Sequence, residues 1–320
     1  MQTPLTTHLI IKNDEAWIEE ALQSILPLDG QILVADIGSK DATPYICEKY
    51  GAAVIRLALK GDMSQVRNRM ASSSKQPWNL YLEPWEKILA GAEEIQQVCL
   101  TTPTNKLFRM SIVQDEIITK ENRLWHRTAK AEFLNPVNEM LAGDAHDIGS
   151  IIHRKKHTNR DEQNAKLLED WKAASPLNTT VMYLEACNLL TRKNWKGFLS
   201  VANHYLFQEK KDLMPTTMIR YYVAMVLCSV FKDFDTATKQ IVACLSVKPL
   251  MAEYWCLLGD IYYKKKRYEQ ARVFYENALD LGRKRQPDDW PMDVPKYRKY
   301  PQEMVRGCTE ILDKSRDYLG

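Results

Sequence analysis

Short apolar runs alternate with helical patterns over roughly the first 85 residues of the chain. The apolar runs lie at residues 7–13, 31–38, 52–59 and 77–83. Between them, apolar residues at helical spacing or helix-start signals predict helices at 16–25, 41–50 and 62–74. Strands that alternate with helices of about ten residues indicate βαβ units. We therefore expect an N-terminal α/β domain with a Rossmann-like, mostly parallel sheet.

Polar residues follow the first two predicted strands. Lys12, Asn13 and Asp14 come after the first, and the segment from Asp36 to Asp41 ends the second. In open parallel sheets, ligands bind beyond the carboxyl ends of the strands. These residues therefore form the first candidate site.

An internal repeat appears in the C-terminal half, which is helical almost throughout from about residue 158. Ala237 and Ala271 are separated by 34 residues. The last copy carries the tetratricopeptide signature at Trp255, Leu258, Gly259, Tyr262, Ala271, Tyr275 and Ala278. A weaker copy begins near Tyr183. The pattern predicts about three repeats, close to the minimum for a stable stack.

These patterns divide the chain into four predicted parts. An α/β domain over 1–157 is followed by a linker helix over 158–178 and by the repeats over 179–285. The last part, 286–320, starts rich in Pro and Asp and ends in a predicted capping helix over 301–318.

Composition narrows the class of protein. The hydrophobic fraction is 45% and the charged fraction is 27%, which is typical of a folded globular chain. We expect no membrane span and no secretory signal, and a cytoplasmic protein whose seven cysteines are reduced, buried thiols. The net charge of +3 neither requires nor excludes a nucleic-acid partner.

Several N-terminal segments together resemble the family 2 glycosyltransferases. The most specific is ILVADIGSKDAT at 32–43, and MSQVRNRMA at 63–71 also matches an element of the family. The others, in the family's order, are HLIIKNDE (8–15), NLYLEPWE (79–86), RLWHR (123–127) and VNE (137–139). The resemblance covers about residues 7–157 and is to the subgroup with a GT-A catalytic domain and tetratricopeptide repeats, including bacteriocin S-glycosyltransferases. It implies a GT-A fold and a nucleotide-sugar donor.

The resemblance implies a nucleotide site, and the residues are chemically suited to it. Asp36 is expected to accept hydrogen bonds from the base or ribose, and Gly38 to allow a tight turn beneath the nucleotide. Arg67 is expected to pair with the diphosphate, because a guanidinium matches phosphate oxygens. Lys12 and Asn13 align with base-proximal residues, although alone they read as a polar turn. Asp41 is either a second nucleotide contact or a helix N-cap.

The fourth strand departs from the family pattern. Relatives carry an Asp-any-Asp-Glu element there that holds Mg²⁺ or Mn²⁺, whereas this chain has Glu83, Pro84, Trp85 and Glu86. His153 aligns with a histidine that often completes the metal site, although a lone histidine after an apolar strand is more often structural. The Mn²⁺ or Mg²⁺ site is therefore weak, rebuilt from Glu83 and His153, or absent. Trp85 either stacks on a sugar or packs the core.

The catalytic base is expected near the end of the domain. Inverting transfer needs a group that takes the proton from the acceptor. Relatives have a His-Glu pair, and this chain has Asn138-Glu139, so Glu139 is the candidate base, with Asp115 and Glu116 in reserve.

Two functions follow from the sequence. The first is inverting transfer of a sugar to a peptide, protein or other macromolecule held by the repeats. The resemblance implies a UDP-linked sugar donor. A nucleic acid or polysaccharide acceptor is an alternative. The second is a degenerate transferase domain that serves as a scaffold, with partners on the repeats. A homodimer formed through the repeats is a further alternative.

Overall fold

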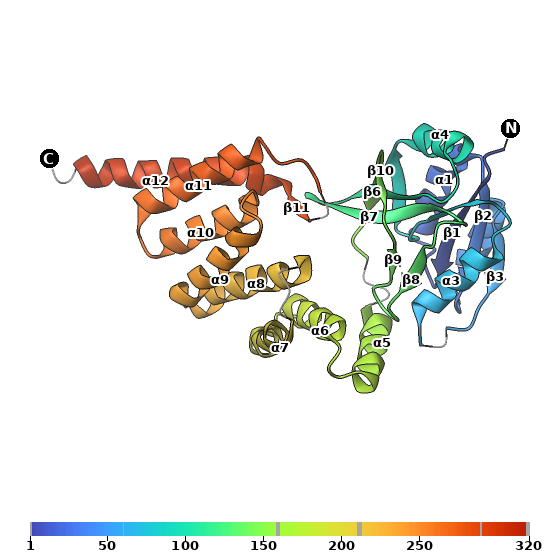
Figure 1. The fold of residues 1–320 in the computed structure, drawn as a ribbon, viewed down its shortest axis with the longest axis horizontal. Coiled ribbons are helices and arrows are strands. Elements are labelled where there is room, and N and C mark those ends of the chain that lie inside the picture. Colours follow the sequence, from blue (N-terminus) through green and yellow to red (C-terminus); the bar gives the residue numbers. More distant parts are fainter. Residues whose placement is uncertain (1, 60, 158–160, 210–212, 289, 318–320) are drawn as a thin grey trace. The chain divides into compact units, whose positions relative to one another are not determined.

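The computed structural model describes residues 2–59, 61–157, 161–209, 213–288 and 290–317. The chain divides into two compact units, Met1–Trp171 and Lys172–Gly320. The division falls inside the segment 158–178, of which residues 158–160 lie outside the described residues. A mixed sheet dominates the first unit, and helices dominate the second (Figure 1).

Four parallel strands form one half of the sheet, in the order β3-β2-β1-β4. Their bounds are β1 (Leu5–Ile11), β2 (Gln31–Asp36), β3 (Ala53–Arg56) and β4 (Trp78–Tyr81). All seven residues of β1 are buried, as expected for a strand covered on both faces. These strands correspond to the four apolar runs in the sequence.

The sheet continues with strands that run in both directions. From β4 the order is β7-β6-β10-β5, with β4-β7, β7-β6 and β10-β5 antiparallel and β6-β10 parallel. The bounds are β5 (Glu86–Ala90), β6 (Leu107–Gln114), β7 (Ile117–His126) and β10 (His146–Arg154). The prediction of a mostly parallel sheet therefore describes only the first half, because a hairpin at Asp115 turns β6 directly into β7.

Amphipathic helices pack onto this sheet. In α1 (Ile18–Ile25) the buried residues recur at helical spacing, from Ile18 through Ala21 and Leu22 to Ile25, and they join the main core. The other helices of the unit are α2 (Thr43–Lys49), α3 (Met63–Ser73) and α4 (Ala92–Thr101), with a short η1 (Leu26–Leu28). A small hairpin, β8 (Glu132–Leu134) and β9 (Met140–Ala142), completes the unit. Helix α5 (Asp161–Ala174) follows and extends past Trp171.

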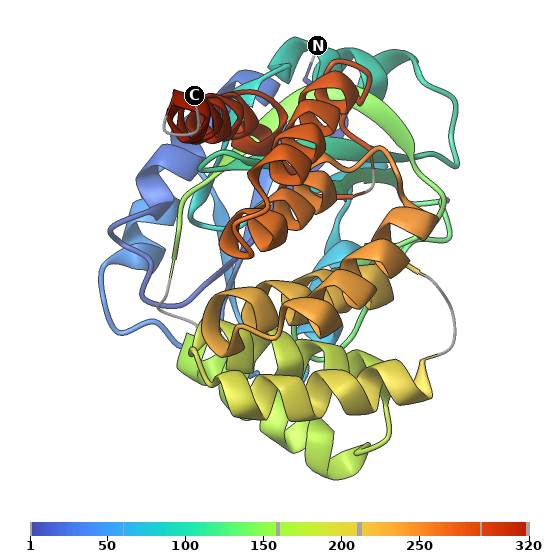
Figure 2. The ribbon, with the colours of Figure 1, turned by 90° about the vertical axis from the view of Figure 1, so that its left-hand side faces the viewer.

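Helices of the second unit pack as consecutive antiparallel pairs, which Figure 2 shows from yellow-green to orange. The pairs are α6 (Thr179–Thr191) with α7 (Trp195–Gln208), α8 (Met214–Val226) with α9 (Phe234–Val247), and α10 (Ala252–Lys264) with α11 (Tyr268–Gly282). Small residues lie where the paired helices approach: Ala186, Ala202, Ala237 and Ala271 are all fully buried. Of these, Ala237 and Ala271 occupy the position that the 34-residue period predicts to be small.

A C-terminal segment covers the last pair of helices. It contains β11 (Met292–Asp293), η3 (Val294–Tyr297) and α12 (Lys299–Asp317), and α12 packs on α11. Arg285 is buried and donates to Tyr297 Oη and, at 3.0 Å, to Asp288 Oδ1. Tyr297 Oη donates to Glu253 Oε2 at 2.5 Å. This network fixes the segment against α10. Residues 318–320 of the predicted cap lie outside the described residues.

One helical segment has the length and composition of a membrane span. Residues Met214–Phe231, which comprise α8 and η2 (Leu227–Phe231), have a mean hydropathy of 1.3 over 18 residues, enough in length and composition to cross a membrane. Buried positions make up 39% of this window, and Ile219, Val223 and Val226 pack in the core shared with α6 and α7. Packing between repeats thus accounts for these three apolar residues.

Candidate functional site

The strand order creates a switch point between β1 and β4. The chain proceeds from β1 outward through β2 to β3, and then returns to the other side of β1 with β4. Beyond the carboxyl ends of these strands lie Lys12 and Asn13 after β1, Asp36 at the end of β2, and Glu83 after β4. Open α/β sheets bind ligands at this kind of position.

Asp36 organises the turn beyond β2. It is 4% exposed, and its Oδ1 accepts from the backbone N–H of Gly38 at 3.0 Å and of Ser39 at 2.7 Å. Gly38 has φ 111°, a conformation that glycine adopts readily. Asn13 Oδ1 accepts from Lys40 N–H at 2.7 Å, which ties this turn to the end of β1. The turn is therefore held in one shape by the side chains that the sequence singled out.

Lys12 and Asp41 also have partners within the chain. Lys12 Nζ donates to Gln163 Oε1 on α5 at 2.9 Å. Asp41 accepts from Thr43 N–H at 3.1 Å and from Thr43 Oγ1 at 2.6 Å. The N-cap position of α2 is Ala42 rather than Asp41, so Asp41 supports the turn one residue before the cap.

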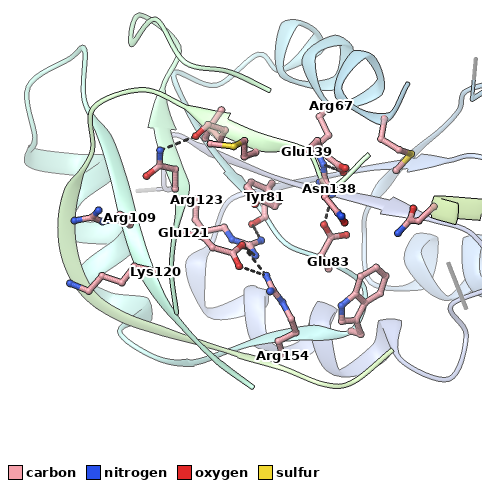
Figure 3. Close-up of a pocket in the computed structure, with 16 residues that line it drawn as sticks. Arg67, Tyr81, Glu83, Arg109, Lys120, Glu121, Arg123, Asn138, Glu139 and Arg154 are labelled. Atoms are coloured by element: carbon pink, nitrogen blue, oxygen red, sulfur yellow. Dashed lines mark hydrogen bonds and ion pairs between the residues drawn. The ribbon is translucent and has the colours of Figure 1, made fainter. Parts of the chain in front are cut away.

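A cavity of about 530 Å³ opens beside the end of β4 (Figure 3). Three residues predicted from separate parts of the sequence, Arg67, Glu83 and Glu139, line it together. The described lining also includes Tyr81, Trp85, Arg109, Lys120, Glu121, Asn122, Arg123, Asn138, Arg154 and Asn164. The predicted nucleotide residues around Asp36 are not among the described residues that line it.

Arg67 lies between the two acids. It projects from α3, whose N-cap Asp62 accepts from Gln65 N–H at 3.3 Å. Its Nε donates to Glu139 Oε1 at 2.6 Å, and its Nη2 donates to Glu83 Oε1. Burial alone would lower the pKa of Arg67, but these two carboxylates raise it above its ordinary value. The guanidinium is therefore a fixed positive charge at the cavity wall.

Aromatic rings hold the Arg67 guanidinium in place. Its Cζ lies 4.7 Å from the ring centroid of Tyr81 and 5.4 Å from that of Phe133. A cation over an aromatic face is stabilised by the ring quadrupole. Helix α3, strand β4 and the β8–β9 hairpin thus all contribute to one arginine site.

A second ionic network contributes Glu121, Arg123 and Arg154 to the cavity wall, and sequence reasoning missed most of it. Arg123 is fully buried on β7 and forms a bidentate pair with Glu86, with both N–O distances 2.9 Å. Arg154 Nε also donates to Glu86 Oε1 at 2.7 Å. Glu121 accepts from both arginines. Although burial raises the pKa of Glu121, the charges of Arg123 and Arg154 lower it to about 2.

The carboxylates of the fourth-strand motif do not fit a divalent cation. Glu83 is paired with Arg67, and Glu86 is paired with Arg123 and Arg154. Trp85, at the central position, stacks on His157 with ring centroids 4.1 Å apart and an interplanar angle of 7°. Across the described part of the chain, no three His, Cys, Asp or Glu side chains cluster as metal ligands would. The acids of this motif have arginine partners instead.

The structure places the remaining candidates at other points of the sheet. His153 lies on β10 opposite Lys87 of β5, and its Nδ1 is buried with no hydrogen-bond partner among the described residues. Asp115, with φ 52°, and Glu116 form the exposed turn between β6 and β7. Neither acid is among the described residues that line the cavity, so Glu139 is the candidate base that the cavity contains.

Comparison with known proteins supports the repeats directly. The tetratricopeptide repeat family model matches residues 252–284. No glycosyltransferase family model matches the chain. A tetratricopeptide repeat-containing protein of Synechococcus elongatus is 22% identical over 301 residues, which cover 82% of this chain and 73% of that protein.

Solved structures resemble either the repeats or the whole chain. MamA of Desulfovibrio magneticus RS-1 is 18% identical, with a TM-score of 0.38, over 50% of this chain and 85% of that one. Staphylococcus aureus TarS 1–349, solved in complex with UDP-GlcNAc, is 14% identical, with a TM-score of 0.41, over 96% of this chain and 92% of that one. The strand order and the family model by themselves show a mixed-sheet unit followed by a helical unit with a tetratricopeptide repeat.

Proposed function

We propose that this chain is an inverting glycosyltransferase that uses a nucleotide-sugar donor, with a GT-A-type first unit. One observation carries the proposal. Arg67, Glu83 and Glu139, each expected in the site from a different sequence motif, line one cavity next to the switch point of the sheet. The group proposed to pair with the diphosphate, Arg67, thus contacts both the retained acid of the fourth strand and the candidate base.

The chemistry needs one proton acceptor and one stabilised leaving group. In the proposed reaction, Glu139 takes the proton from the acceptor nucleophile. The nucleophile forms a bond to the anomeric carbon as the bond from that carbon to the diphosphate oxygen breaks. The nucleoside diphosphate leaves with the electron pair and carries the developing negative charge. Cationic side chains that line the cavity, Arg67 among them, are suited to stabilise that charge.

The nucleoside would bind at the turn beyond β2. Asp36 and Asn13 hold this turn at the carboxyl ends of neighbouring strands. We propose a uridine diphosphate sugar as the donor, on the family resemblance, and a peptide or protein as the acceptor. Stacked helical repeats present extended surfaces suited to a polypeptide, and the family of the last repeat is established here. A cytoplasmic location is part of the same proposal.

The competing function is a scaffold that binds partners through the repeats without catalysis. The observation that favours it is the replacement of the central motif acid by Trp85, whose ring stacks on His157. Thermal-shift screening with nucleotide-sugars separates the two functions, because a ligand that binds the native state raises its melting temperature. If none of the nucleotide-sugars raises the melting temperature, the scaffold function is favoured.

The direct test is mass spectrometry of candidate peptide and protein acceptors after incubation with a panel of nucleotide-sugars. We expect a hexose-type mass gain with one donor. Asp36→Asn is the sharpest variant, because the amide oxygen still accepts the turn's N–H bonds while the charge is removed. Asp29→Asn, at the end of η1, is the matched control. The proposal is rejected if no acceptor gains mass with any nucleotide-sugar and the chain binds no nucleotide.

A further inference from the structure

Arg67 pairs with Glu83, the acid of the fourth-strand motif that a bound cation would be expected to use. Its guanidinium bridges Glu83, the surviving first acid of the fourth-strand motif, and Glu139, the candidate base. Both carboxylates are largely buried, with side chains 13% and 11% exposed. We propose that Arg67 takes the place of a divalent cation, so that the site binds its diphosphate ligand without metal. The identity of the ligand as a diphosphate depends on the proposed function, whereas the replacement of a cation by Arg67 does not.

The trailing acid of the motif is equally unavailable to a metal. Glu86 is 1% exposed, and its two oxygens accept four hydrogen bonds, three from arginine and one from the backbone N–H of Glu83 at 2.9 Å. Four bonds use the acceptor capacity of a carboxylate. A cation at Glu86 would have to displace Arg123, which is itself fully buried. Separating such a pair leaves an uncompensated charge in the interior.

The geometry of Arg67 suits an anionic ligand. The bonds to Glu83 and Glu139 use one N–H of Nη2 and the N–H of Nε. A guanidinium carries five N–H groups in a fixed plane, so three more belong to the same group. Because Tyr81 and Phe133 fix the plane and α3 fixes the stem, the orientation is set before a ligand arrives. Guanidinium groups pair with phosphate oxygens in a bidentate way.

The cation replacement is tested first, without any nucleotide. Mn²⁺ is titrated into the full chain and followed by electron paramagnetic resonance, which distinguishes free from bound Mn²⁺. We expect the spectrum of free Mn²⁺ throughout. One equivalent of bound Mn²⁺ that is lost in Glu83→Gln would overturn the proposal, because it would show that Arg67 yields its place to the metal.

The second test concerns the ligand. Uridine diphosphate binding is measured calorimetrically with EDTA and, separately, with Mn²⁺. We expect the same Kd in both, and a Kd about 10- to 100-fold higher in Arg67→Gln, as for loss of a charged hydrogen bond. Arg69→Gln, exposed on the same helix, is the matched control and should bind like the unmodified chain. Tighter binding with Mn²⁺ than with EDTA would overturn the proposal.

Failure of the proposed function is distinguishable from failure of this inference. If no nucleotide binds under any condition, the proposed glycosyltransferase function is rejected. The Mn²⁺ spectrum alone then decides whether Arg67 replaces a cation. Circular dichroism establishes that Arg67→Gln is folded. If it is not, Arg67→Lys, which keeps the charge but loses the planar group, takes its place and should also weaken uridine diphosphate binding.

Discussion

The Nε of Arg67 lies 2.6 Å from Oε1 of Glu139, although the two residues are 72 positions apart in the chain. This bond joins α3 to the segment before β9, and so it fixes the candidate base relative to the sheet. One carboxylate oxygen is thereby occupied. Proton transfer from an acceptor would then use the other oxygen of Glu139.

Replacement of Glu139 by glutamine is therefore expected to abolish transfer with little effect on donor binding. The amide oxygen can still accept the Arg67 N–H, so the local fold is kept, but glutamine cannot take up a proton. We expect the transfer rate to fall by about 10²- to 10⁴-fold, the usual contribution of general base catalysis. The rate is followed by mass spectrometry of the acceptor. Glu132→Gln, exposed on β8, is the control. If Glu139→Gln keeps its transfer activity, Glu139 is not the catalytic base.

The buried pair of Arg123 and Glu86 is expected to be essential for stability. In Arg123→Met, the carboxylate of Glu86 loses its bidentate partner in a fully buried position. Breaking a buried pair from one side costs about 3–5 kcal/mol. We expect the free energy of unfolding of the first unit to fall by that amount in urea denaturation. Lys130→Met, an exposed change of the same kind, should have little effect, and equal stability of the two variants would contradict this reading.

The sequence predicted the parallel half of the sheet and the repeats because local signals define both. Four apolar runs became β1 to β4, and the 34-residue period placed Ala237 and Ala271 in the helix crossings. It did not predict β5, α4 or the direction of β7. These elements depend on pairings between distant segments, such as β10 with both β6 and β5, and no local pattern encodes such pairings.

The candidate site was predictable to a similar extent. Motif residues gave Arg67, Glu83 and Glu139, and the structure brings them together. Glu121 and Arg154 carried no recognisable signal, since each reads as a charged residue on a surface strand. Glu121 lies two residues before Arg123 on β7 and so shares its face of the strand, while Arg154 of β10 pairs with both Glu121 and Glu86.

His8 is expected to make stability depend on pH. It is 4% exposed, and its Nε2 lies 2.8 Å from Asn79 Oδ1. Burial lowers the pKa of His8 from 6.5 to about 4, despite the hydrogen bond to Asn79. The unfolded chain therefore binds the proton more readily between these values, so stability is full above pH 6.5 and is lost as the pH falls toward 4. The shift corresponds to about 3 kcal/mol.

Urea denaturation at a series of pH values measures this dependence. In His8→Leu the unfolding free energy should fall less between pH 6.5 and pH 4 than in the unmodified chain, because the titrating group is gone. His146→Gln, an exposed histidine on β10, should leave the slope unchanged. If His8→Leu has the slope of the unmodified chain, another group is responsible for the pH dependence.

Gly259 is expected to be irreplaceable in the last repeat, whereas Gly307 is not. A Cβ at Gly259 would lie 2.6 Å from Cε1 of Tyr275, whose ring is fully buried and whose Oη donates to Asp260 at 2.7 Å. The ring cannot move without losing that bond, so Gly259→Ala should destabilise the second unit by about 1–3 kcal/mol.

At Gly307, within α12, a Cβ meets no atom inside 4 Å. There, Gly307→Ala should stabilise the helix by about 0.5–1 kcal/mol, because alanine is the better helix former. Thermal unfolding is monitored by circular dichroism. The melting temperature should fall in Gly259→Ala and rise in Gly307→Ala. If both variants shift in the same direction, close packing of α10 on α11 does not determine the identity of residue 259.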